Sequence, residues 1–79
     1  MQSGLLWFDS TPGLPLAEKV GQGAEHYRTK YGRMPDVCYV NAAALKEGEF
    51  SMPFHEGKLR VVAASNILPH HFWIGANDG

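Results

Sequence analysis

The sequence has a single cysteine, Cys38, among its 79 residues, so no disulfide can form within the chain. Such scarcity of cysteine is typical of proteins from the reducing cytoplasm. Long hydrophobic runs are absent as well: the longest contain four or five residues, whereas a membrane-spanning helix needs roughly 20. No basic segment followed by an apolar stretch predicts a signal peptide. We therefore expect a cytoplasmic protein with no membrane segment.

The chain also lacks an excess of either charge. Seven lysines and arginines stand against eight aspartates and glutamates, which gives a formal net charge of −1. Proteins bind phosphate backbones through clustered cations. The nearest approach to a cluster here is Arg28, Lys30 and Arg33, or the pair Lys58 and Arg60. We therefore do not expect a nucleic-acid partner and rank that function last.

What the sequence does contain is the composition of one small globular domain, spanning residues 1–79. The chain is 44% hydrophobic and 19% charged, which is ordinary for a globular protein. A domain of this length buries only about 60–65% of its unfolded surface, so its stability is marginal unless something supplements it.

The central pattern, residues 14–41, predicts a helix, a glycine stop and an apolar strand. Pro15 suits the first helical position. The apolar residues that follow recur every three or four positions, as they do on the buried side of a helix: Leu16, Val20, Ala24, Tyr27 and Tyr31. Gly32 predicts a left-handed C-terminal cap. Of two glycines inside the helix, we expect Gly21 to allow close approach to a sheet, and Gly23 has no evident role.

Four strands are expected. Residues 5–8 and 37–40 are apolar at every position, which is typical of strands buried on both faces. The helix between them predicts a β-α-β unit with these two strands as parallel neighbours. Residues 58–65 and 70–75 predict two more strands, and residues 49–57 a loop, with a brief extended piece inside it as an alternative. The fold class is thus α/β, with α+β as the alternative: a two-layer sandwich of one long helix on a four-stranded mixed sheet.

Three of these four strands carry large apolar side chains on both faces. One long helix covers one face of a small sheet. A short helix at residues 42–46 and the loop around residues 52–54 would cover only part of the other. Exposed apolar patches of more than a few hundred Å² are unusual on monomers. We therefore expect a homo-oligomer, most simply a dimer, with a different protein partner as the alternative.

Asp9 and Asn41 are the first candidate site residues. Each directly follows an apolar strand, so parallel neighbouring strands would place the two side by side at the carboxyl edge of the sheet. Open α/β sheets hold their ligands at this edge, and a carboxylate beside an amide suits a hydrogen-bonded ligand. The alternative, which we favour, is structural: Asp9 begins a turn and Asn41 caps the short helix.

Three histidines, His55, His70 and His71, are further candidates. Imidazoles are ligands for zinc or iron. However, adjacent strand residues point to opposite faces, and no established zinc-ligand spacing is present. We expect no metal and no cofactor, and retain His55 and His71 as ligand-binding candidates. Cys38 lies inside an apolar strand, so we expect an unreactive core thiol with a raised pKa.

Residues 31–41 (YGRMPDVCYVN) and 68–75 (LPHHFWIG) resemble segments of small uncharacterised bacterial proteins. Those proteins have Trp-Phe/Tyr-Asp near the start, as residues 6–9 (LWFD) do here. The resemblance covers most of the chain. It implies a free-standing small domain of unknown function, and it implies no catalytic residue, cofactor or partner.

Two functional hypotheses follow. The first is an interaction or accessory domain that acts through homo-oligomerisation or through binding a protein partner. The second is an enzyme or small-ligand binder that uses the carboxyl edge of the sheet near Asp9 and Asn41. The surplus of strands that are apolar on both faces favours the first, a non-enzymatic role.

Overall fold

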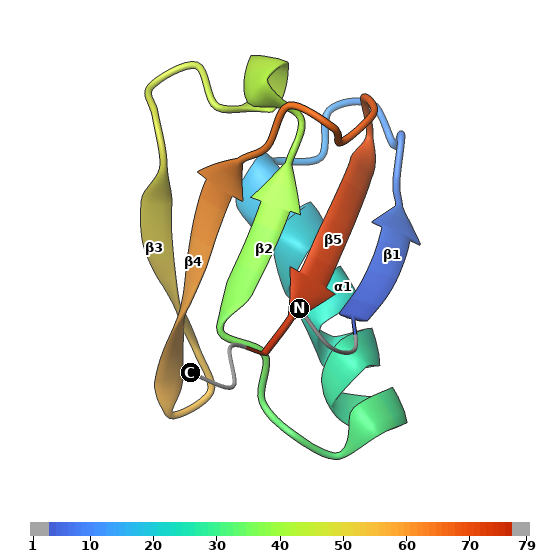
Figure 1. The fold of residues 1–79 in the computed structure, drawn as a ribbon, viewed down its shortest axis with the longest axis vertical. Coiled ribbons are helices and arrows are strands. Elements are labelled where there is room, and N and C mark those ends of the chain that lie inside the picture. The colour runs from blue at the N-terminus through green and yellow to red at the C-terminus, as the bar shows by residue number, and fades with distance from the viewer. Residues whose placement is uncertain (1–3, 77–79) are drawn as a thin grey trace.

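The structure, a computed structural model, describes residues 4–76. Its elements are β1 (Gly4–Phe8), α1 (Leu16–Tyr31), β2 (Val37–Val40), the 3-10 helix η1 (Ala42–Ala44), β3 (Phe50–Phe54), β4 (Gly57–Ala63) and β5 (His71–Gly75). Five strands form one mixed sheet in the order β1-β5-β2-β4-β3, and α1 lies along one face of it (Figure 1). The predicted class, one helix layered on a mixed sheet, is confirmed, with one strand more than expected.

The additional strand is β3, in the segment that the sequence predicts to be a loop. It pairs antiparallel with β4 through a tight turn at His55 and Glu56. Pro53 has no amide hydrogen to donate, which an edge strand tolerates because one of its sides is unpaired. Because of this proline and the polar residues before it, the sequence pattern favoured a loop over a strand. As a consequence, residues 50–54 extend the sheet. The expectation that the loop around residues 52–54 covers part of the second face is therefore not met.

The expectation that β1 and β2 are neighbours is wrong. They run in the same direction, but β5 lies between them and is antiparallel to both (Figure 1). The parallel neighbour of β2 is β4. A local pattern shows that a segment is a strand but not which distant strand it pairs with. This interior place gives β5 a hydrogen-bonded partner on each side, which suits a strand whose sequence is mostly apolar.

The helix α1 forms as the periodicity predicts. It ends at Gly32, which has a φ of 69° and whose N–H donates to the Arg28 carbonyl at 2.8 Å, so the left-handed cap is confirmed. Val20, Ala24 and Tyr27 are buried against the sheet. The other fully buried side chains of the core are Cys38, Val40, Leu59, Val61 and Ile74. No helix within residues 4–76 is long and apolar enough to cross a membrane.

The helix comes closest to the sheet at Gly23. A Cβ atom there would lie 2.5 Å from Ile74 Cδ1 and 2.9 Å from two ring carbons of Trp7. At Gly21 the nearest atom to an added Cβ would be Met52 Cε at 3.9 Å, an ordinary contact. The role that the sequence suggests for Gly21 therefore belongs to Gly23, because only Gly23 faces both β1 and β5.

This difference predicts opposite effects of the same substitution at the two glycines. Alanine has a helix propensity about 1 kcal/mol more favourable than that of glycine, so Gly21→Ala should raise the free energy of unfolding by up to about 1 kcal/mol. Gly23→Ala should lower it, because forcing extra atoms into a packed core costs about 1–3 kcal/mol. Urea denaturation of both variants measures the difference. A similar gain for both would contradict the close approach at Gly23.

Candidate functional site

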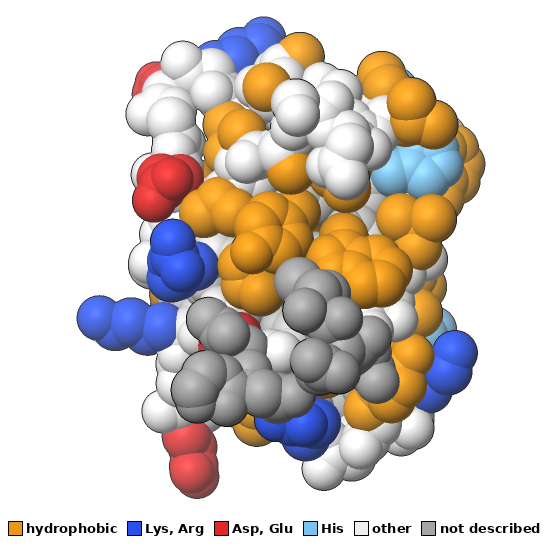
Figure 2. All heavy atoms as spheres, in the orientation of Figure 1, with side chains coloured by type: hydrophobic (Ala, Val, Ile, Leu, Met, Phe, Trp, Pro, Cys, Tyr) orange, Lys and Arg blue, Asp and Glu red, His pale blue; other side chains and the backbone are white. Residues whose placement is uncertain are grey.

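The face of the sheet opposite α1 carries a row of apolar side chains. In the strand register Leu6 pairs with Trp73, Trp73 with Tyr39, and Tyr39 with Val62. Phe8 lies two residues along β1 on the same side. We call these five residues the helix-free face. Leu6 and Phe8 leave 59% and 57% of their surface exposed. Figure 2 shows hydrophobic side chains gathered over this side of the sheet, with charged side chains around its edges.

The loop between β4 and β5 borders the helix-free face and forms a hollow beside it. This cavity has a volume of about 470 Å³ and is lined by Tyr39, Ala64, Asn66, Ile67 and Trp73. Leu68, from the same loop, is 66% exposed. The face therefore combines projecting apolar side chains with a concave region. Well-packed protein–protein interfaces fit such projections and hollows together.

His71 adjoins the helix-free face. Its ring lies over Phe8 with 5.0 Å between the ring centroids. Its Nδ1 atom is 2.9 Å from the Pro69 carbonyl oxygen, so the Nδ1 proton is donated to that carbonyl. The sequence predicts His71 as a ligand-binding residue, and the structure places it at the junction between the helix-free face and the carboxyl edge of β1 and β2.

Asp9 and Asn41 share this carboxyl edge, but they are not side by side. The start of β5 lies between them, and two strand spacings of about 4.8 Å separate β1 from β2. A ligand hydrogen-bonded to both would have to bridge about 10 Å across the loop that leads into β5. The geometry proposed for these two residues from the sequence therefore depended on a strand pairing that does not exist.

Both side chains are occupied within the protein. Asp9 Oδ1 accepts from the Thr11 N–H at 2.9 Å. The hydrogen bonds from the side chain and backbone of Thr11 hold the pKa of Asp9 below its usual value. Asn41 Oδ1 accepts from the Ala43 N–H at 2.9 Å, and Asn41 Nδ2 donates to the Ile67 carbonyl at 2.8 Å. These are the turn and cap roles given as the structural alternative.

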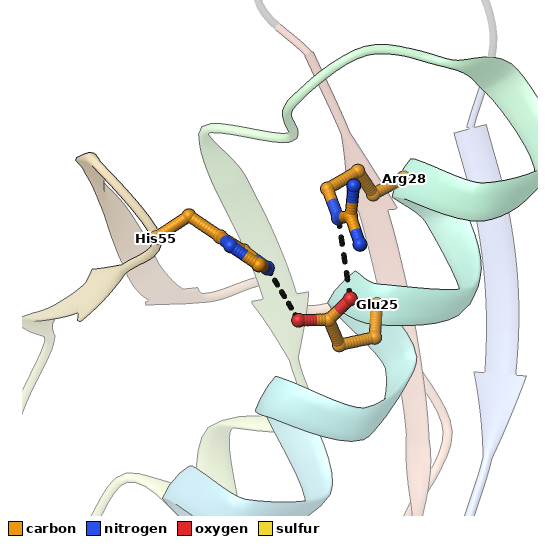
Figure 3. Close-up of polar contacts among 3 residues, drawn as sticks. All are labelled: Glu25, Arg28 and His55. Atoms are coloured by element: carbon orange, nitrogen blue, oxygen red, sulfur yellow. Dashed lines mark hydrogen bonds and ion pairs between the residues drawn. The ribbon is translucent and has the colours of Figure 1, made fainter.

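His55 lies at the other end of the sheet, in the turn between β3 and β4. Its Nε2 atom bonds to Glu25 of α1, and the other oxygen of Glu25 lies 3.2 Å from Arg28 Nε (Figure 3). The contact ties the outer hairpin to the helix. The sequence did not indicate these partners of His55, because a residue pair 30 positions apart leaves no local signal. His55 therefore does not share a site with Asp9, Asn41 or His71.

Cys38 is a core residue, as expected. It is fully buried in β2, and burial raises the pKa of its thiol to about 12. Within residues 4–76 no three histidine, cysteine, aspartate or glutamate side chains lie close enough together to hold a metal ion.

Comparisons of the chain with protein-family models, with curated proteins and with solved structures found no match. The function therefore has to be inferred from the surfaces described above.

Lys19 and Lys46, which line a second cavity at the carboxyl edge, were not among the candidate residues predicted from the sequence. Only their positions in the sequence could have indicated a site. Lys19 lies in the first turn of the helix that follows β1, and Lys46 lies just after η1, which follows β2.

The Glu25–His55 contact predicts a pH-dependent contribution to stability. The hydrogen bond from His55, assisted by Arg28, lowers the pKa of Glu25 from 4.5. A lowered carboxyl pKa stabilises the folded state at pH values above the unfolded pKa, and this stabilisation is lost as the pH falls through the folded pKa. Glu25→Gln should therefore reduce the melting temperature at pH 7, and the difference from wild type should vanish in acid.

We expect a small effect, because exposed ion pairs contribute little. Thermal melts between pH 2 and pH 7 measure it, with Glu47→Gln in an exposed loop as the matched control. The prediction fails if the Glu25→Gln difference is the same at both ends of this range, or if the control reproduces its pH dependence.

Proposed function

We propose that this chain is a small cytoplasmic interaction domain that acts by self-association, as a homodimer joined through the helix-free face. The observation that carries the proposal is the exposure of Leu6 and Phe8, at 59% and 57%, beside the half-buried rings of Tyr39 and Trp73. Burial of apolar surface contributes roughly 25 cal/mol per Å², so covering such side chains favours association.

The charge on this face suits a second copy of the same chain. A two-fold interface sets one patch against itself, so a charge near its centre would meet a like charge. The row of Leu6, Trp73, Tyr39 and Val62 has no ionic side chain. Lys58 and Arg60, which lie along β4 on the same side of the sheet, line a hollow with Asp36 at the border of this row. Arg60 also lies 3.9 Å from Glu49, so cations and anions stand together there. Self-association through this face therefore brings no central charges together.

The area that such a dimer needs is a modest part of the surface of the molecule. A stable complex of standard size buries about 800 Å² on each partner, about one sixth of the 4998 Å² that this chain exposes. The molecule extends 29 × 23 Å perpendicular to its shortest axis, the direction along which Figures 1 and 2 are viewed. A dimer would also supplement the small hydrophobic core of a 79-residue chain.

Size-exclusion chromatography with light scattering tests this proposal. At about 50 µM, far above the Kd of a stable complex, we expect a mass of twice 8.7 kDa for the wild type. Leu6→Glu with Phe8→Glu should give 8.7 kDa, because four carboxylates would then meet in the interface. Met34→Glu is the matched control: Met34 is also an exposed apolar residue, but it lies in the segment after α1, and the dimer should persist.

Circular dichroism should show that the double variant remains folded, since both substituted side chains are largely exposed. A wild-type mass of 8.7 kDa would overturn the homodimer. So would a double variant that retains the wild-type mass, because the interface would then lie elsewhere on the molecule.

A further inference from the structure

The second cavity lies at the carboxyl edge of β1 and β2, on the side of the sheet that α1 covers. The start of α1, the end of β2, η1 and the start of β5 surround it, and its volume is about 480 Å³. Pockets for small organic molecules range from about 300 to 1,000 Å³. The cavity is thus large enough for a ligand of about ten non-hydrogen atoms.

The lining of this cavity has two chemical parts. Leu14, Leu16 and Ala44 give it an accessible apolar wall, and the core residues Val40 and Phe72 complete its lining. Its ionic side chains are Lys19 and Lys46, with His70 beside them, and no carboxylate is among the described residues that line it. An apolar wall with a few cationic groups is the lining that binds an organic anion, because ammonium groups pair with a carboxylate or phosphate head.

Asp9 does not cancel this positive charge. Asp9 does not line the cavity, and one of its carboxylate oxygens already accepts a hydrogen bond from Thr11. Lys19 and His70 are close enough to assist Thr11 in lowering the pKa of Asp9. Two lysines against one aspartate leave a net positive charge before any contribution from His70.

The polypeptide fixes the shape of the cavity. Asn41 lines it and has both polar atoms of its side chain hydrogen-bonded within the protein, so it holds the wall in place. His70 has a left-handed backbone with φ of 66°, and its carbonyl accepts from the Asp9 N–H at 3.0 Å. The bond from the His71 N–H to the Leu68 carbonyl closes the turn that presents the His70 imidazole.

We propose that this cavity binds a small organic anion, with its carboxylate or phosphate head on Lys19 and Lys46 and its apolar body against Leu14, Leu16 and Ala44. The proposal assigns the principal ligand contacts at this edge to Lys19 and Lys46 instead of to Asp9 and Asn41. It does not depend on self-association, since the helix-free face lies on the other side of the sheet.

NMR titration of the ¹⁵N-labelled full chain tests the proposal with phenylacetate, phenylacetamide, phenyl phosphate and inorganic phosphate as probes. For a ligand of about ten heavy atoms we expect a Kd on the order of 1 mM for phenylacetate or phenyl phosphate. Amide shifts should be centred on the first turn of α1, on η1 and on residues 70–72. Phenylacetamide, which has the same shape without the charge, should bind at least about tenfold more weakly.

The phosphate probes separate the two halves of the cavity. If the apolar wall takes part, inorganic phosphate should bind at least about tenfold more weakly than phenyl phosphate. The pair Lys19→Met and Lys46→Met keeps the apolar stems and should weaken phenylacetate binding at least about tenfold. Lys58→Met, on β4 and outside the lining, is the matched control and should leave the Kd unchanged.

Three results would overturn the proposal. They are equal binding of phenylacetate and phenylacetamide, an unchanged phenylacetate Kd in the double lysine variant, and the absence of saturable shifts around the cavity at about 20 mM probe, well above the expected Kd. The comparison of the two probes uses the wild-type chain, so it decides the question even if the lysine variant does not fold.

Discussion

The fold depends on how closely one helix approaches one face of a five-stranded sheet. Gly23 makes this approach possible, because any larger residue would meet Trp7 and Ile74. With that contact made, Val20 and Ala24 are completely buried. The same chain has no second long helix within residues 4–76 to place on the opposite face. The exposed row on β1 and β5 is therefore a direct consequence of one-sided cover, and the proposed dimer supplies the missing layer.

The insertion of β5 between β1 and β2 determines what the carboxyl edge can do. Parallel neighbours would have left that edge open between Asp9 and Asn41. Instead the loop that leads into β5 passes there, and it is held from both sides: the Asp9 N–H bonds to the His70 carbonyl, and Asn41 Nδ2 bonds to the Ile67 carbonyl. Asp9 and Asn41, which a ligand at that edge would have contacted, thus hold the loop before β5 in place. The cavity lies nearer to α1 and η1.

Features that depend on neighbouring residues could be predicted from the sequence. They include the helix, its Gly32 cap, the Asn41 cap and the strand at residues 70–75. Features that depend on distant contacts could not. Nothing near Gly23 shows that Trp7 and Ile74 will lie above it, and nothing near β5 shows that it separates β1 from β2. The site predicted at Asp9 and Asn41 also depended on a distant contact, since its geometry required pairing between strands about 30 residues apart.

The two proposed surfaces are physically separable. The cavity is bounded by Leu16, Val40 and Phe72, whose side chains belong to the helix-covered side of the sheet. The proposed dimer contact uses the opposite side, so a second copy there would leave the cavity open. Among the residues that the structure describes, His71 adjoins both, because it lines the cavity while its ring lies over Phe8. Coupling between ligand binding and self-association would pass most directly through the contact of His71 with Phe8, and it requires a ligand whose affinity differs between monomer and dimer.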